Sequence, residues 1–294
     1  MRQSSGVAVA GMGLLAVMLT SGPAPAANAA APGGLIQFAP HRAVYEITLE
    51  RAASGSGVVE LAGRMVYELN GSRCEGYTQN MRFVTRIVSQ DGSEQVNDLR
   101  TSSWEDGAGQ RLRFNSEQYR DAKLVETTAG DARRPAKAGG PITVDVVRPS
   151  KLELEIEAAN LFPMQHSRAL LSAAEQGQHQ LVAGLYDGSD KGEKVYQTSA
   201  WIGQGLSYDA NGKVPPELAK RPSWPVSIAY FEPGSDTKDA LPAYELSFRI
   251  FENGVSSAML IDYGEFAVRG ELKELIYFKR TDCGSQGAVG PSRE

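Results

Sequence analysis

The chain has 294 residues, of which 41% are hydrophobic, so it is long enough to bury a sizeable core. Its 30 lysines and arginines stand against 35 acidic residues, and the formal net charge of −5 excludes the basic surface expected of a nucleic-acid-binding protein. The length fits one large β domain or two small ones.

The first predicted element is a secretory signal peptide at residues 1–29. Arg2 precedes a short apolar stretch at 7–19, and the small-residue string APAANAA follows, an order typical of such leaders. We expect cleavage after Ala29, with Ala26 as the alternative site. Neither this stretch nor any later one reaches the roughly 20 apolar residues that a membrane-crossing helix needs. No cysteine follows the leader to carry a lipid anchor, so we expect a periplasmic protein without a transmembrane segment.

Period-two alternation of apolar and polar residues dominates the remaining sequence and predicts a mostly β protein. It is clearest in AVYEITL, KLELEIE and YELSFRI, which begin at residues 43, 151 and 244. Such alternation is typical of strands that bury one face and expose the other. Asn-Gly and Asp-Gly pairs, which favour hairpin turns, begin at residues 70, 91, 106, 187, 211 and 253. We therefore expect a long antiparallel meander of about a dozen strands from Phe38 to Lys279, curled or closed to protect its edges.

One segment departs from this pattern and predicts a helix over about 163–176. Pro163 suits the first helical turn, Leu170 belongs to an apolar stripe with helical spacing, and Gly177 suits a C-terminal cap. A helix of this length on a curved sheet is expected to plug one open end. His166 is expected at the helix surface or in a local hydrogen bond.

The domain organisation follows from the loops. Strand pattern resumes after three stretches rich in proline, glycine and charged residues, which favours loops over domain linkers. These stretches are 133–141, 213–225 and 232–242. We therefore expect a single domain over 38–284. Residues 30–37 are expected to be flexible and residues 285–294 to form a disordered tail, because both segments are small and polar.

Cys74 and Cys283 are the only cysteines in the sequence. An even number of cysteines in an exported chain favours a structural disulfide over a metal site or a catalytic thiol. The alternative is two separate buried thiols. A disulfide would hold the end of the last strand beside the start of the third, as a clasp on the curled sheet.

The sequence predicts no catalytic residues, no metal site and no cofactor. His41, His166 and His179 are too few and too poorly spaced to ligate zinc. Ser235 opens an S-x-x-K pattern, but it lies in a loop and no S-D-N or K-T-G follows. Three glutamates share one strand face, where repulsion between like charges can raise a pKa enough for acid catalysis, but a solvated outer face explains them with no chemistry. They are Glu153, Glu155 and Glu157.

A basic grouping on successive strands is the candidate ligand site. Its members are Arg82, Arg86, Arg100, Arg111 and Arg113. On the concave side of a curled sheet they would receive an anionic group such as a phospholipid head or a peptide carboxylate. The alternative is a charged exterior opposite the core face. Aromatic residues are candidates for the same surface or for the core. They are Trp104, Trp201, Trp224, Tyr230 and Phe231.

Four strings spread along the chain carry a family resemblance. They are APHRAVYEITL at 39–49, LFPMQH at 161–166, SWPV at 223–226 and YELSFRIFENGVSSAMLIDYGEFAVRGELKEL at 244–275. Together they resemble the periplasmic EipB family of cell-envelope integrity proteins from alphaproteobacteria, over nearly the whole mature chain. Cys74 and Cys283 lie where that family carries its disulfide. The resemblance implies a spiral-like open β-barrel with a helix at one end, similar to lipoprotein carriers, and no catalytic residues.

The sequence thus predicts a non-enzymatic periplasmic binding or scaffold protein that maintains the cell envelope under stress, with a periplasmic protein, a peptide or a lipid as its partner. The first alternative is a lipid or lipoprotein carrier, which requires a sizeable apolar cavity rather than a packed interior. The second is an envelope hydrolase that uses the glutamates or Ser235.

Overall fold

The computed structural model describes residues 36–206, 215–234, 240–280 and 283. The signal peptide predicted at 1–29, the tail predicted at 285–294 and Ser235 lie outside these ranges. Within them, no helix is both long and apolar enough to cross a membrane.

The described residues form a 14-stranded antiparallel sheet and a single α-helix. The strands before the helix are β1 (His41–Ala52), β2 (Val58–Ser72), β3 (Gly76–Ser89), β4 (Glu94–Glu105), β5 (Arg111–Arg120), β6 (Lys123–Arg133), β7 (Ile142–Arg148) and β8 (Leu152–Ile156). The helix is α1 (Pro163–Glu175). After it come β9 (Gln180–Leu185), the 3-10 helix η1 (Asp190–Gly192), β10 (Tyr196–Ile202), β11 (Ser223–Phe231), β12 (Tyr244–Phe251), β13 (Ser256–Asp262) and β14 (Phe266–Tyr277). The predicted mostly β meander with one helix is confirmed.

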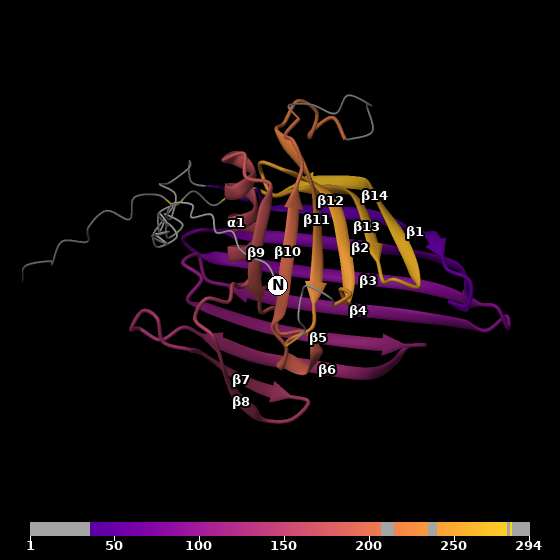
Figure 1. Ribbon diagram of the computed structural model, residues 1–294, viewed down its shortest axis with the longest axis horizontal. Helices are drawn as coiled ribbons and strands as arrows, with labels where there is room; N and C mark the ends of the chain where they lie inside the picture. The colour runs from indigo at the N-terminus through magenta and orange to yellow at the C-terminus, as the bar shows by residue number, and fades with distance from the viewer. Residues whose placement is uncertain (1–35, 207–214, 235–239, 281–282, 284–294) are drawn as a thin grey trace, which may run out of the picture. The chain divides into compact units, whose positions relative to one another are not determined.

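The strand order is β8-β7-β6-β5-β4-β3-β2-β1-β14-β13-β12-β11-β10-β9. Two meanders, β1–β8 and β9–β14, are therefore joined where the first strand pairs with the last. Figure 1 shows β9–β12 crossing in front of β3–β6, so the sheet folds over and its two halves face each other. Strands β8 and β9 remain edges of the described sheet, which makes it an open barrel rather than a closed one.

Turn chemistry explains three of the chain reversals between strands. Asp91-Gly92, Asp106-Gly107 and Asn253-Gly254 lie between consecutive strands, as predicted. The turn predicted at Asn70-Gly71 is wrong, because β2 continues to Ser72 and the chain reverses in the next three residues. Glycine accepts the φ of +99° found at Gly71 without strain, so the pair is accommodated inside the strand.

Side-chain packing closes the gap between the two edges of the sheet, and backbone hydrogen bonds also join β9 to Leu161 in the segment after β8. Phe162 and Tyr186, which flank α1 and β9, pack against buried residues of β5–β8. The Tyr186 and Phe114 rings meet edge to face, with centroids 5.8 Å apart. Gly188 permits this closure, because a Cβ there would lie 2.3 Å from the Phe114 ring. Each large apolar side chain buried in such a cluster contributes about 1.5–3 kcal/mol.

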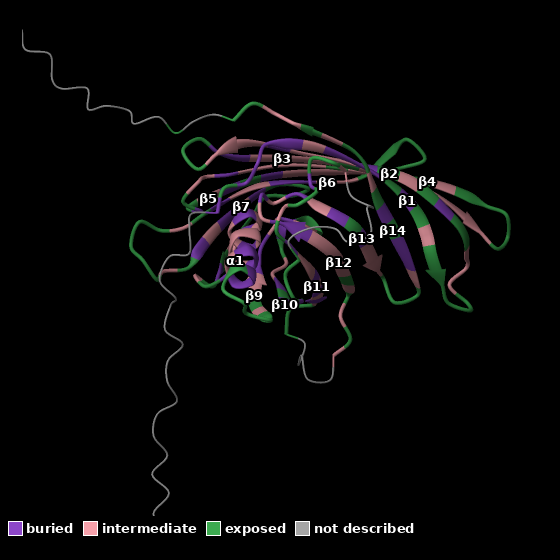
Figure 2. Cartoon of the chain, turned by 90° about the horizontal axis from the view of Figure 1, so that it is seen from above, coloured by how far each residue is buried: buried purple, intermediate pink, exposed green. Residues whose placement is uncertain are grey.

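Helix α1 packs beside β9, and Figure 2 shows it nearly end-on, with exposed residues gathered at the hairpin ends of the sheet. Its buried apolar residues belong to the same core cluster as residues of β10–β12. The helix begins at Pro163, as predicted, and ends at Glu175, two residues before Gly177, whose φ is +69°. It therefore lies where its apolar face can close one end of the space inside the sheet.

Candidate functional site

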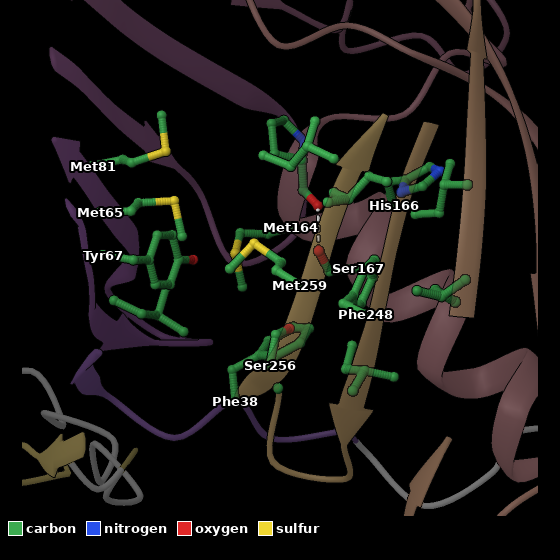
Figure 3. A pocket seen from close by; sticks show the side chains of 18 of the residues that line it. Phe38, Met65, Tyr67, Met81, Met164, His166, Ser167, Phe248, Ser256 and Met259 are labelled. Carbon is green, nitrogen blue, oxygen red and sulfur yellow. Dashed lines mark hydrogen bonds between the residues drawn. The ribbon is translucent and has the colours of Figure 1, made fainter. Parts of the chain in front are cut away.

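An apolar cavity of about 350 Å³ lies between the facing halves of the sheet. One wall comes from β1, β2 and β3, the opposite wall from β11, β12 and β13, and α1 contributes a third side (Figure 3). Its volume falls within the range of about 300–1,000 Å³ typical of small-molecule pockets. The interior is thus not completely filled by side chains, which is the feature that a carrier requires.

Period-two alternation brings the lining residues of the first wall together. Met65 lies opposite Tyr45 in the β1–β2 pairing, and Met81 lies opposite Tyr67 in the β2–β3 pairing. These side chains alternate with residues that face away from the cavity. The sequence therefore specifies one continuous apolar face across three strands.

Methionine is unusually frequent in this lining. The four methionines that contribute to it are Met65, Met81, Met164 and Met259. They come from β2, β3, α1 and β13, and Figure 3 shows Met65, Met81 and Met259 extending toward the open space. Unbranched thioether side chains adapt to irregular shapes at little cost, which suits a pocket for flexible apolar ligands.

His166 contributes an imidazole to the cavity from α1. The ring is 5% exposed, so the alternative position at the helix surface is wrong. Its Nε2 lies 3.0 Å from the Thr198 hydroxyl of β10. Burial lowers the pKa of His166 to about 4, which keeps the ring neutral at physiological pH.

His41, at the start of β1, contributes a second imidazole. Its Nδ1 donates a hydrogen bond to the Ala39 carbonyl at 2.7 Å, and its ring packs against Tyr67 with centroids 5.7 Å apart. Burial lowers the pKa of this ring as well, and the bond to Ala39 opposes that shift. Burial therefore favours the neutral form of both histidines that line the cavity.

Two tyrosine hydroxyls of the wall are bonded to the protein. Tyr45 donates to the backbone carbonyl of Ser256 at 2.7 Å and so ties β1 to β13. Tyr67 donates to Gln79 Oε1 at 3.0 Å. Burial raises the pKa of both phenols, so they stay protonated in this apolar setting.

A buried carboxylate holds the helix that borders the cavity. Glu105, the last residue of β4, accepts hydrogen bonds from the backbone amides of Met164 at 2.7 Å and Gln165 at 3.0 Å. These amides lie in the first turn of α1, where backbone donors lack partners inside the helix. Burial raises the pKa of Glu105 to about 7, against the opposing effect of the two amides.

Arg134 fixes the segment that enters the helix. Its guanidinium donates to the carbonyls of Gly109, Ala158 and Asn160 at 2.6–2.9 Å and to the Gln165 side chain at 2.9 Å. Together with Glu105, it connects the start of α1 to the β4–β6 part of the sheet. The position of the cavity-lining helix is therefore set by residues far from it in sequence.

The structure places the predicted arginines on the outer face, away from the cavity. Arg82 and Arg100 both bind the carboxylate of Asp98, and Arg86 pairs with Glu60 and Glu94. The neighbouring residues of β3, Met81 and Phe83, pack on the opposite, inner side.

The arginines of β5 form a similar outer cluster. Arg111 and Arg113 share the carboxylate of Asp131 with Arg133. Arg82, Arg86, Arg111 and Arg113 are thus partnered by acidic side chains within the protein. Ligand binding by them stays a prediction, but it concerns a surface separate from the cavity.

The tryptophans are spread over the molecule. The Trp104 indole donates to the Glu75 carbonyl at 3.2 Å and carries the Arg113 guanidinium 5.5 Å from its ring centroid. Trp201 is 54% exposed in β10, whereas Trp224 of β11 is partly buried against the core cluster that includes residues of α1. Of the aromatic candidates, Tyr230 lines the cavity.

Cys74 and Cys283 form a disulfide in the structure, with Cα atoms 5.8 Å apart. Cys74 lies in the turn before β3, and Cys283 follows β14 by six positions. The bridge therefore joins the two segments named by the sequence interpretation.

The groups considered for hydrolysis do not converge on the cavity. Glu153, Glu155 and Glu157 are exposed in or beside the edge strand β8. In the described ranges, no group of three or more histidine, cysteine, aspartate or glutamate side chains is arranged to hold a metal ion.

The sequence analysis did not predict the residues that line the cavity. The signal available for them was the set of inward-facing methionines and tyrosines in β2 and β3.

Comparisons with known proteins agree with this architecture. A model of the EipB-like family matches residues 32–279. The cell envelope integrity protein EipB of Brucella abortus (strain 2308) is 37% identical over 250 residues, covering 85% of this chain and 88% of that protein. A crystal structure from Brucella abortus, described as a beta-barrel-like protein of the domain of unknown function DUF1849, matches with a TM-score of 0.76 and 37% identity, covering 83% of this chain and 100% of the other. Because the family model spans most of the sequence, the chain belongs to the EipB-like family.

Proposed function

We propose that the protein is a non-enzymatic periplasmic binding protein that holds an apolar ligand, such as the acyl chain of a lipid, in the cavity inside its sheet. This activity would serve the integrity of the cell envelope, the role named for the Brucella relative. The observation that carries the proposal is the cavity of about 350 Å³, lined mainly by apolar side chains.

The chemistry of the lining supports an aliphatic ligand. Four methionines and the rings of Phe38 and Phe248 offer dispersion contacts without fixed polar geometry. None of the described residues that line the cavity carries a formal charge at neutral pH. A pocket of this kind gains free energy by removing an apolar chain from water.

Among the sequence-based alternatives, the cavity favours the lipid carrier over a scaffold that acts only through its outer surface. The carrier model requires a sizeable apolar space, and such a space lies between the facing sheet halves. Its volume suits one chain better than a large multi-chain lipid, so we favour partial insertion of a ligand.

Binding can be tested with N-phenyl-1-naphthylamine, an uncharged fluorescent probe that brightens in apolar sites. We expect saturable binding to the mature protein and displacement by dodecan-1-ol. Substituting Met65→Trp or Met259→Trp adds an indole from opposite walls and should abolish binding. Val182→Trp is the matched control, because Val182 is 72% exposed on the edge strand β9.

The decisive comparison is between the cavity variants and the surface variant. Loss of probe binding in both methionine variants, with retention in Val182→Trp, supports a ligand inside the sheet. Unchanged probe binding in folded Met65→Trp and Met259→Trp would overturn the proposal. Mass spectrometry of organic extracts of the purified wild type would identify a native lipid that remains bound.

A further inference from the structure

The polar atoms inside the cavity are biased toward hydrogen-bond acceptors. The hydroxyl protons of Tyr45, Tyr67 and Ser167 are donated to protein oxygens, in the last case to the Pro163 carbonyl at 2.9 Å (Figure 3). Those groups have no proton left for a ligand. The two imidazoles require separate treatment, because a neutral histidine presents one donor and one acceptor.

The hydrogen-bond chain around His166 determines which nitrogen carries its proton. The Thr198 hydroxyl donates its single proton to the Ala183 carbonyl at 2.8 Å. It must therefore accept from His166, whose Nε2 lies 3.0 Å away and carries the N–H. In the neutral ring, Nδ1 is then an unprotonated acceptor, and it has no hydrogen bond within the described part of the chain.

His41 also has one unprotonated acceptor nitrogen, but in this ring the proton lies on Nδ1 rather than Nε2. The Ala39 carbonyl can only accept a hydrogen bond, so the proton lies on His41 Nδ1. In the neutral ring, Nε2 is an acceptor, and none of the described residues donates to it. The cavity lining thus includes two imidazoles that each retain an acceptor nitrogen.

Two further hydroxyl groups belong to the cavity lining. Those of Ser256 and Tyr230 have no hydrogen bond among the described residues, and a hydroxyl can either donate or accept. The acceptor nitrogens of His41 and His166 have no such freedom. A ligand that removes these acceptor nitrogens from water without supplying a donor leaves them unpaired, which is costly, so a ligand with a donor is favoured over one with only acceptors.

Charge narrows the ligand class further. No arginine, lysine, aspartate or glutamate belongs to the described lining, so neither a carboxylate nor an ammonium group would find a counter-charge inside. Burying an unpaired ion is far more costly than burying a neutral polar group. The cavity therefore disfavours ligands that would place a carboxylate or a phosphate beside His41 or His166, such as free fatty acids and lipid phosphate headgroups.

We propose that the cavity selects uncharged amphiphiles in which an apolar chain ends in a hydroxyl, with that hydroxyl donating to the acceptor nitrogen of His166 or His41. This inference rests on the proposed function, because it names the ligand class of the same cavity. A lipid alcohol satisfies both requirements: its chain fills the methionine-lined space, and its O–H donates to imidazole while its oxygen accepts from Ser256 or Tyr230.

The test compares three ligands with matched chains in displacement of N-phenyl-1-naphthylamine from the wild type. Dodecan-1-ol can donate, dodecyl methyl ether can only accept, and dodecanoate is charged. We expect dodecan-1-ol to bind about tenfold more tightly than the ether, as one additional hydrogen bond allows. Dodecanoate should bind more weakly than the alcohol.

Histidine variants test whether His41 and His166 cause the preference for the alcohol over the ether. In His41→Phe/His166→Phe, dodecan-1-ol and the ether should bind within about twofold of each other. His179→Phe is the matched control and should keep the wild-type preference. His179 also bonds a carbonyl, that of Ile202 at 2.9 Å, but it is not among the residues that line the cavity.

The outcomes separate the two proposals. Displacement by all three chains with equal affinity in the wild type would overturn the hydroxyl preference and leave the binding function intact. Failure of every chain to displace the probe would overturn both. A preference for the alcohol that persists in the folded double variant would overturn the role of the histidines. The wild-type series decides the ligand class even where the double variant does not fold.

Discussion

The Glu105 carboxylate accepts the backbone N–H of Met164 at 2.7 Å, although the two residues lie 59 positions apart. A residue at the end of a strand thus performs the capping role that a residue adjacent to the helix usually fills. The contact fixes α1 against the sheet and, through α1, sets one boundary of the cavity.

Burial of the Glu105 carboxyl group makes the stability of the fold depend on pH. Burial raises the pKa of Glu105 from its ordinary value of 4.5 to about 7. The pKa of Glu105 is higher in the folded state than in the unfolded state. The contribution of Glu105 to stability is therefore fully present below pH 4.5 and is lost as the pH rises through about 7. We expect the wild type to lose free energy of unfolding between pH 5 and pH 8 relative to Glu105→Gln, as measured by urea denaturation at about four pH values.

The comparison with a variant is necessary because the histidines act in the opposite direction. The pKa of His166 is lowered from 6.5 to about 4, so its contribution is present above pH 6.5 and declines as the pH falls. Subtracting the Glu105→Gln profile removes this common background. Glu153→Gln, at an exposed position in β8, is the control, and equal profiles for wild type and Glu105→Gln would contradict the expectation.

Removal of the disulfide should destabilise the protein. We expect Cys74→Ser/Cys283→Ser to lose about 2–5 kcal/mol, because the bridge closes a loop between segments 209 positions apart. For a chain of this size the loss corresponds to a decrease in Tm of roughly 5–15 °C. Calorimetry with and without reductant measures it. Reductant should lower the Tm of the wild type alone, and an unchanged Tm in both conditions would refute the clasp.

Leu170 tests the contribution of α1 to the core. Its side chain is 2% exposed and belongs to the cluster shared by the helix and β9–β12. We expect Leu170→Ala to cost about 2–5 kcal/mol of unfolding free energy, because it removes buried methyl groups beside an existing cavity. Urea denaturation gives the value. Glu175→Ala, at the exposed end of the same helix, should cost much less.

The outer arginines should matter little for the cavity. In Arg82→Gln/Arg86→Gln we expect unchanged binding of N-phenyl-1-naphthylamine and a small loss of thermal stability, because exposed ion pairs contribute little. Fluorescence titration and a melting curve measure both quantities. A large loss of probe affinity in this variant would show that the arginine surface and the cavity act together.

Local patterns were sufficient to predict the strands and the helix. Alternation in YELSFRI predicts β12, and Pro163 with Gly177 marks the helix almost to the residue, because these signals depend on neighbours in sequence. Alternation also separates Arg82 from Phe83 onto opposite faces. It does not say which face turns inward when the sheet curls.

The candidate site depends on contacts that have no local signal. In the sequence, Glu105 has the pattern of a polar residue at the end of a strand, and only the folded sheet brings it close to Met164. The acceptor nitrogen of His166 is likewise determined by Thr198, 32 positions away and on another element. The cavity could not be predicted because it is a space between two halves of a sheet, and period-two patterning describes one strand at a time.

Because β1 pairs with β14, the sheet cannot be completed until the last strand has been synthesised. β1 is synthesised first but needs β14, the last strand, to cover its second edge. Until that strand arrives, strands β1–β8 and β9–β13 of the described sheet share no backbone hydrogen bonds, and the opposite cavity walls depend on contacts such as the hydrogen bond from Tyr45 to Ser256. A chain that stops before Phe266 would therefore present two unfinished sheets, each with an open edge available to other chains.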